Sequence, residues 1–325
     1  MLTGPAIYWA IVKLAIVLAA TGVLAYVGTS FLMAFALLSP TRMGAGRAMY
    51  FLHRLSPSDI NLPYESIRFR VRDDRTGRPL HLAAWWIDCD RPSERCAVIL
   101  HGYSDAKVGG IAWAPLLRSY GFNILAVDLR AHGESEGKYS TAAFFERHDI
   151  GQVLDQIKIS RPTQTRQILL FGVSLGAAVA AAVAAMRNDL SAVVLESPYV
   201  DFPHAVLNHA ANLPLPGRRF QRLAIWFCQR IAHIDYSAVR PIDMIPKIHC
   251  PLWIVQSGDD PFVTEAENKA IEETARKRAA NLGFTDVWHV PECHHVIALS
   301  EHPEEFARRL AEFLEAALAV SAPAK

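Results

Sequence analysis

The chain has 325 residues and a formal net charge of +1, from 33 Lys and Arg against 32 Asp and Glu. This balance provides no field that would attract nucleic acid, and no basic run suggests such a partner. The five cysteines include no Cys-x-x-Cys pair, which argues against a zinc site and a full disulfide framework, although Cys89 and Cys96 are close enough in sequence to form a bridge.

The N-terminal segment is apolar over an unusual length. Residues 6–38 contain one charge, Lys13, and the next charge is Arg42. About 20 apolar residues suffice to cross a bilayer, whereas a removable signal peptide has a shorter apolar core and a small-x-small exit. We therefore expect residues 1–45 to form a retained single-pass transmembrane anchor and residues 46–325 to form one domain. A hairpin buried against that domain is the weaker alternative.

The charges that flank this anchor bear on its orientation. Arg42, Arg47 and Arg54 follow it, whereas Lys13 and the α-amino group lie on the N-terminal side. Positive residues are enriched on the cytoplasmic side of membrane helices. We therefore expect the domain to be cytoplasmic, by a margin of about one charge.

Eight strand-like runs follow the anchor. Two of them, residues 66–71 and 80–86, form an opening pair. The other six begin at Ala97, Asn123, Gln167, Ala192, Leu252 and Thr285. From the third run onward the connections are long enough for crossover helices, which predicts an α/β fold with a mainly parallel eight-stranded sheet.

A nucleophile-elbow pattern joins the strand that begins at Gln167 to an alanine-rich helical run, residues 177–186. Residues 172–176 read Gly-Val-Ser-Leu-Gly, the spacing in which a strained strand-to-helix turn holds the serine at the end of a strand. The two glycines let neighbouring backbone approach without a Cβ clash. The sequence therefore predicts a serine hydrolase with Ser174 as nucleophile.

An oxyanion hole beside this serine would need two backbone N–H donors. The strand-like run from Ala97 ends in His101-Gly102-Tyr103, where the following loop is expected to supply one donor. We predict that the N–H groups of Tyr103 and Leu175 are the donors. His101 precedes the serine in the chain, and we interpret it as a structural residue rather than the base.

The connection over residues 197–249 is too long for a single crossover helix. Four prolines, Pro198, Pro203, Pro214 and Pro216, precede a helical stretch with apolar residues such as Trp226 and Phe227. We interpret residues 198–248 as a small helical cap over Ser174. Alternatively, these apolar residues form only the inner face of an ordinary crossover helix.

The acid of a triad is expected at the end of a strand. Asp259 and Asp260 both follow the strand that begins at Leu252, and the Asp-Pro-x-Val pattern that starts at Asp260 favours this residue. Glu196 ends the neighbouring strand-like run and is a third candidate.

The base is expected on a loop between the last strand, residues 287–290, and the last helix, residues 303–318. That loop, residues 291–295, contains His294 and His295. We predict His295. His294 stays an alternative, because adjacent side chains on a loop cannot be ranked by periodicity.

Together these motifs resemble the α/β-hydrolase superfamily, most closely its monoacylglycerol-lipase-like and serine-aminopeptidase-like branch. The resemblance covers about residues 67–314 and includes residues 123–137, the Ser174 elbow, Asp260 and His295. It implies the α/β-hydrolase fold, a Ser-His-Asp triad, hydrolysis of an acyl bond and no cofactor. In this family a glycine often precedes the catalytic histidine, whereas a histidine stands there in this chain.

The resemblance also bears on the charged segment Asp128–Ser135, which is a structural turn in such relatives. The next helix is expected to open at residues 145–149, and we interpret its charges as capping or ion-pairing groups.

The sequence thus predicts a membrane-anchored serine hydrolase that cleaves a carboxylic ester or thioester of lipid-like character, without a bound metal. A peptidase or amidase with the same triad is the alternative enzyme. A catalytically silent membrane scaffold on this fold is the alternative outside the enzymes, and the triad residues argue against it.

Overall fold

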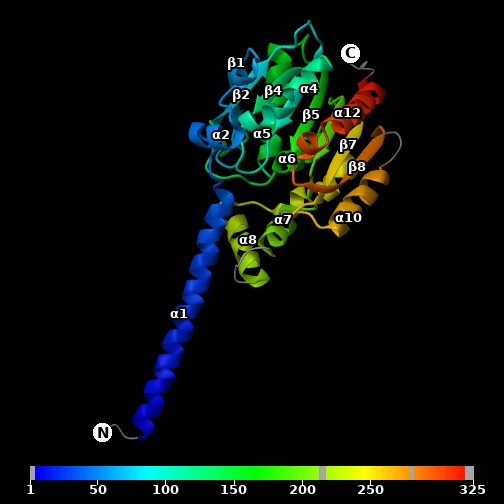
Figure 1. Cartoon of the computed structure of the whole chain (residues 1–325). Helices are drawn as coiled ribbons and strands as arrows, with labels where there is room; N and C mark the ends of the chain where they lie inside the picture. Colours follow the sequence, from blue (N-terminus) through cyan, green and yellow to red (C-terminus); the bar gives the residue numbers. More distant parts are fainter. Residues whose placement is uncertain (1–3, 212–216, 279–281, 319–325) are drawn as a thin grey trace.

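The computed structural model describes residues 4–211, 217–278 and 282–318. A long helix, α1 (Gly4–Leu38), projects from a domain in which helices flank one sheet (Figure 1). The strands are β1 (Glu65–Arg72), β2 (Pro79–Ile87), β3 (Arg95–Leu100), β4 (Asn123–Val127), β5 (Gln167–Val173), β6 (Ala192–Glu196), β7 (Leu252–Asp259) and β8 (Thr285–His294). The other helices are α2 (Ala45–Leu52), α3 (Lys107–Gly110), α4 (Ala114–Ser119), α5 (Glu146–Ser160), α6 (Leu175–Ala184), α7 (Phe202–Ala211), α8 (Arg218–Ala232), α9 (Pro241–Met244), α10 (Glu265–Arg276), α11 (Ala298–Glu301) and α12 (Pro303–Leu318).

The eight strands form one sheet in the order β1-β2-β4-β3-β5-β6-β7-β8. Pairing is antiparallel from β1 to β2 and from β2 to β4, and parallel across the rest of the sheet. Strands β4 and β6 are buried along their whole length, as expected where helices cover both faces of a parallel sheet. The predicted α/β-hydrolase fold with a mainly parallel eight-stranded sheet is therefore confirmed.

The prediction of a loop over residues 291–295 is wrong, because β8 continues to His294. Past a bulge between Ser257 and Asp259, Asp259 of β7 still pairs with His294 of β8. Pro291 suggested that the strand had ended, since proline cannot donate to a ladder. However, β8 is the last strand in the sheet order, and proline is tolerated at such an edge.

The connection between β6 and β7 contains α7 and α8, so it is more than one crossover helix. Helix α8 lies beside α1 in Figure 1, and the two helices pack through aromatic pairs. The rings of Tyr26 and Phe220 are 5.7 Å apart, and those of Phe31 and Phe227 are 5.3 Å apart. Trp226 is exposed on the outer side of α8.

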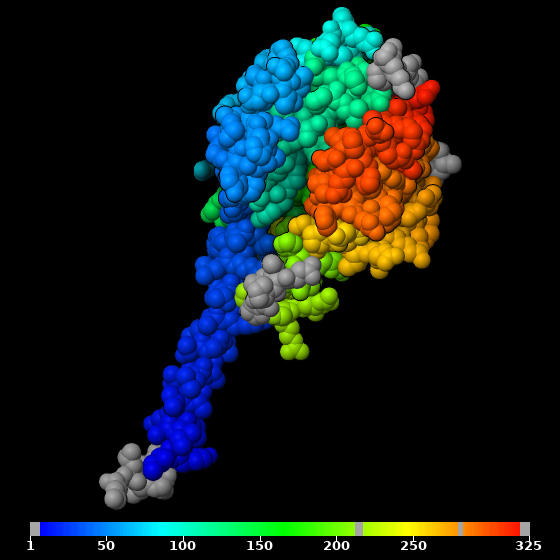
Figure 2. Space-filling model, in the orientation of Figure 1, coloured from blue at the N-terminus to red at the C-terminus, as the bar shows by residue number. Residues whose placement is uncertain are grey.

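The two ends of α1 have different surroundings. Figure 2 shows the helix as a narrow stalk that leaves the body of the domain. Residues 7–11 are exposed, whereas Ser30, Ala34 and Leu38 are fully buried at a spacing of four residues. Such a spacing places all three on one helix face. The last turns of α1, which belong to the predicted anchor, are therefore packed into the core of the domain.

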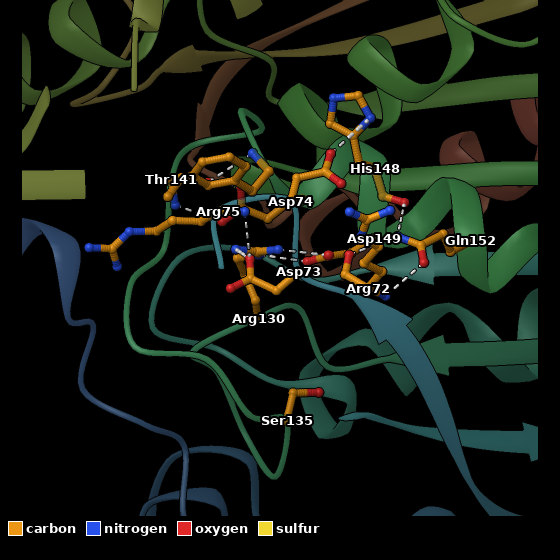
Figure 3. A network of polar contacts seen from close by, with 12 residues as sticks. Arg72, Asp73, Asp74, Arg75, Arg130, Ser135, Thr141, His148, Asp149 and Gln152 are labelled. Atoms are coloured by element: carbon orange, nitrogen blue, oxygen red, sulfur yellow. Dashed lines mark hydrogen bonds and ion pairs between the residues drawn. The ribbon is translucent and has the colours of Figure 1, made fainter. Parts of the chain in front are cut away.

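The charged segment that follows β4 has a structural role, as expected. Arg130 makes a bidentate ion pair with Asp149 of α5, at 2.6 and 2.7 Å, and also binds Asp73 of the β1–β2 turn at 3.0 Å (Figure 3). Arg42 fixes the chain after α1 to the same region, because its guanidinium donates to the carbonyl oxygens of Gly133 and Ser135. These contacts tie the chain after α1, the first hairpin and α5 together.

Candidate active site

Ser174 lies at the turn between β5 and α6. Its backbone is strained, with φ 53° and ψ −112°, as expected for a nucleophile elbow. A Cβ on Gly172 would lie 2.2 Å from the carbonyl oxygen of Gly176, and one on Gly176 would lie 2.0 Å from the carbonyl oxygen of Leu100. Only glycine fits at either position, which explains the Gly-x-Ser-x-Gly spacing.

His295 and Asp260 complete a hydrogen-bonded chain that ends at Ser174. The Nε2 atom of His295 is 2.8 Å from Ser174 Oγ, and its Nδ1 atom is 2.6 Å from Asp260 Oδ2. The Asp260 side chain is 1% exposed, and its other oxygen accepts the N–H of Phe262 at 2.8 Å. An acid held in this way can fix the imidazole so that Nε2 is free to take a proton from the serine.

The two rival residues pair with each other instead. Nδ1 of His294 is 2.9 Å from Asp259 Oδ2, and these side chains are 65% and 68% exposed. His294 ends β8 and Asp259 ends β7, so their pairing belongs to the ladder. This pairing holds His294 at the exposed end of β8, whereas His295 lies in the turn after the strand and reaches the serine.

Glu196, the third candidate acid, has no side-chain hydrogen bond to the described residues and is fully buried. Burial raises the pKa of its carboxyl to about 8. Its backbone carbonyl accepts the N–H of Ser174 at 2.9 Å, so Glu196 contacts the elbow through its backbone.

Both predicted oxyanion donors lie at the pocket that contains Ser174. Leu175 is the first residue of α6, where a helix N–H has no intrahelical partner. Tyr103 lies on the loop after β3, and a Cβ on the adjacent Gly102 would lie 3.5 Å from Ser174 Cβ. The Tyr103 loop therefore approaches the serine closely.

His101 supports the loop that carries Tyr103. It is buried, with Nε2 accepting the N–H of Leu129 at 3.0 Å and Nδ1 2.7 Å from the carbonyl oxygen of Gly102. Burial holds the pKa of His101 well below its usual range. A neutral imidazole in these bonds is a structural residue, as the sequence suggested.

The pocket over Ser174 has a volume of about 500 Å³ and is lined mainly by apolar side chains. Helix α7 supplies the residues Phe202, Ala205, Val206, His209 and Ala210. The parts of the connection that reach the pocket are therefore α7 and Tyr199, which precedes it. Helix α8 packs against α7 and α1.

A family profile described as the Alpha/beta hydrolase family matches residues 97–309, which contain the elbow, the acid and the histidine. The chain belongs to the alpha/beta hydrolase family. The strand order and the elbow geometry agree with this membership.

Curated relatives of this alpha/beta hydrolase are distant. The uncharacterised protein YqkD of Bacillus subtilis (strain 168) is 23% identical over 67% of this chain and 70% of its own length. The lysophosphatidylserine lipase ABHD12 of Xenopus tropicalis is 24% identical over 58% of this chain. The alignment spans 48% of the frog protein, about half its length.

Solved structures show the same fold. The esterase Pf2001 of Pyrococcus furiosus superimposes with a TM-score of 0.67 at 23% identity, covering 86% of this chain and 97% of the esterase. The acylaminoacyl peptidase of Pyrococcus horikoshii superimposes with a TM-score of 0.55 at 16% identity, covering 80% of this chain and 42% of the peptidase.

Three of the residues that line the pocket of this alpha/beta hydrolase were not predicted from its sequence. Met33 and Leu37 come from α1, inside the run interpreted as membrane anchor. Asp105 follows the Tyr103 loop, and burial raises the pKa of its carboxyl to about 6. No local pattern distinguishes an apolar residue that faces lipid from one that faces a pocket.

Proposed function

We propose that this protein is a membrane-anchored serine hydrolase that cleaves a carboxylic ester or thioester of lipid-like character. The observation that carries the proposal is the Ser174–His295–Asp260 chain, with distances of 2.8 and 2.6 Å, at the floor of an apolar pocket. A nucleophile, a base within hydrogen-bond reach and a buried group that orients the base are the parts that acyl transfer needs.

In the proposed reaction, Ser174 Oγ attacks the carbonyl carbon of the substrate while His295 Nε2 takes its proton. The N–H groups of Tyr103 and Leu175 stabilise the oxyanion, and Asp260 stabilises the imidazolium. The bond from the carbonyl carbon to the leaving oxygen or sulfur then breaks, and His295 returns the proton to the leaving group. A water, deprotonated by His295, hydrolyses the acyl-enzyme and restores Ser174.

The apolar pocket and the names of two similar proteins support the lipid-like character of the proposed substrate. Apolar side chains such as Phe202 and Val206 favour an acyl chain over a charged group. One relative is named a lysophosphatidylserine lipase and one fold neighbour an esterase. The proposed substrate is a small-molecule acyl compound of the lipid type, and nucleic acid is not a proposed partner.

Membrane attachment through α1 is part of the proposal. Among the described residues, Ile7–Leu38 is the one helical stretch long and apolar enough to cross a membrane. The positive residues that follow α1 support a cytoplasmic catalytic domain.

Fluorophosphonate labelling of the full-length protein in detergent tests the proposed nucleophile. We expect wild type to be labelled and to hydrolyse p-nitrophenyl esters, and Ser174→Ala to lose both by about 10⁶-fold while its melting temperature stays close to that of wild type. Labelling of Ser174→Ala at the wild-type rate would refute the proposal. Competition by esters, thioesters and peptides then identifies the acyl bond, and competition by peptides alone would favour an amidase.

A further inference from the structure

Helix α1 is longer than a bilayer requires. Its 35 residues extend about 50 Å at about 1.5 Å per residue, whereas the hydrocarbon core of a bilayer is about 30 Å thick. The excess of about 20 Å corresponds to about 13 residues. The domain covers a segment of that length, from Tyr26, which packs on Phe220, to the buried Leu38. The outer part of α1 thus suffices for the membrane and leaves the last turns for the domain.

Those last turns reach the candidate active site. Met33 and Leu37, four residues apart on one helix face, line the same pocket as Ser174. The neighbouring face, with Ala34 and Leu38, is buried in the core. The pocket therefore has a wall that the hydrolase domain alone does not supply.

The end of α1 is held in place by its terminal carbonyl groups, which have no partner inside the helix. The Tyr103 hydroxyl lies 3.0 Å from the carbonyl oxygen of Ala36 and 2.9 Å from that of Leu37, and donates to this pair. The N–H of Ser140 donates to Leu38 O at 2.8 Å. Tyr103 is also a proposed oxyanion donor, so α1 is bonded to the loop that would bind the reacting carbonyl.

We propose that the last turns of α1 form part of the acyl-binding site, and that Met33 and Leu37 contact a long acyl chain drawn from the membrane leaflet. This inference rests on the proposed function. The outer turns of α1 carry exposed apolar residues such as Leu24, and its last turns carry the pocket-lining residues, so a lipid tail that lies along the helix is led to the pocket. The substrate class is a long-chain acyl ester of a membrane lipid.

The test compares a short and a long substrate on the full-length protein in detergent. The quantity measured is the ratio of kcat/KM for p-nitrophenyl dodecanoate to that for p-nitrophenyl butyrate. Leu37→Trp fills the space that a long chain would occupy, and Leu37→Ala removes the contact. Leu32→Trp is the matched control, because Leu32 lies on the same helix, is 67% exposed and does not line the pocket.

We expect the ratio to fall at least tenfold in Leu37→Trp and severalfold in Leu37→Ala, and to change less than twofold in Leu32→Trp. A ratio that stays within twofold of wild type in both Leu37 variants overturns the inference. An equal fall in Leu32→Trp also overturns it. Fluorophosphonate labelling shows which variants retain an assembled active site. If Leu37→Trp is not labelled, the ratio measured for Leu37→Ala alone tests the inference.

The source of the chain is tested in phosphatidylcholine vesicles. We expect p-nitrophenyl palmitate to be hydrolysed at least tenfold faster when it shares a vesicle with the protein than when separate vesicles carry it. Equal rates would overturn entry from the leaflet. Failure of the proposed function is distinguishable, since Ser174→Ala would then retain hydrolysis of every ester, whereas failure of this inference alone leaves Ser174 essential and the ratio unchanged.

Discussion

The pocket has two walls, and different forces hold them. On one side, Ser174, His295 and Asp260 extend from the ends of strands and are fixed by short hydrogen bonds. On the other side, the last turns of α1 are held by apolar packing of α1 against α8, which lies far away in the sequence, together with hydrogen bonds that Tyr103 and Ser140 donate to their terminal carbonyl oxygens. Changes at the first wall should therefore slow the reaction of every substrate, whereas changes at the second should alter which substrates bind.

The largest difference between neighbouring residues is expected at the two histidines. His295→Ala should lower kcat by several orders of magnitude on both short and long esters, because the base is lost. His294→Ala should change kcat by less than about threefold, because His294 pairs only with the exposed Asp259. Steady-state kinetics on both p-nitrophenyl esters measure this. If the His294 variant were the slower one, the base would be His294.

The acid should have the next largest effect. Asp260→Asn leaves the size of the side chain unchanged but favours the wrong tautomer of His295, so kcat should fall by up to about 10⁴-fold with little change in KM. Asp259→Asn is the matched control and should keep a kcat close to that of wild type. The assignment of the acid to Asp260 would not survive the opposite ranking.

Two truncations separate the two parts of α1. Removal of residues 2–25 should release the protein from membranes and keep its esterase activity, because residues 26–38 still cover the core. Removal of residues 2–45 exposes the surface that buries Ala34 and Leu38 and opens the pocket. This second protein should aggregate, or its activity on the dodecanoate ester should fall at least tenfold. Sedimentation and kinetics measure both effects, and equal behaviour of the two would mean that α1 contributes only the anchor.

The smallest kinetic effect is expected at Glu196. Glu196→Gln should leave kcat within about threefold of wild type, since the carboxyl has no hydrogen bond to the triad. Stability should respond instead. The folded pKa of about 8 lies above the ordinary value of 4.5, so the folded state binds more protons, and wild type loses stability as the pH rises through that window. Melting temperatures at pH 5.5 and 8.5 should show a relative gain for the variant at the higher pH. No such gain would mean that Glu196 is charged in the folded protein.

Much of the first wall could be predicted from local sequence. The Gly-x-Ser-x-Gly pattern around Ser174 can be recognised in the sequence because both flanking positions require glycine. At each of them a backbone carbonyl lies too close to leave room for the Cβ of any other residue. The strands could be predicted because a parallel sheet that is buried on both faces needs continuous runs of apolar residues. The end of β8 was misread, since Pro291 marks the end of a central strand but is permitted at an edge.

The sequence by itself therefore determined the strand-helix alternation, the serine elbow and a helix long enough for a bilayer, because each depends on interactions between residues close in the chain. Only the tertiary structure showed which of the two histidines lies against Ser174, since the pairing of β7 with β8 places His294 beside Asp259 and the turn that follows brings His295 to the serine. It also decided that Met33 and Leu37 line the pocket. An apolar side chain is equally suited to lipid and to a protein interior, and which of the two it contacts depends on segments that are remote in sequence.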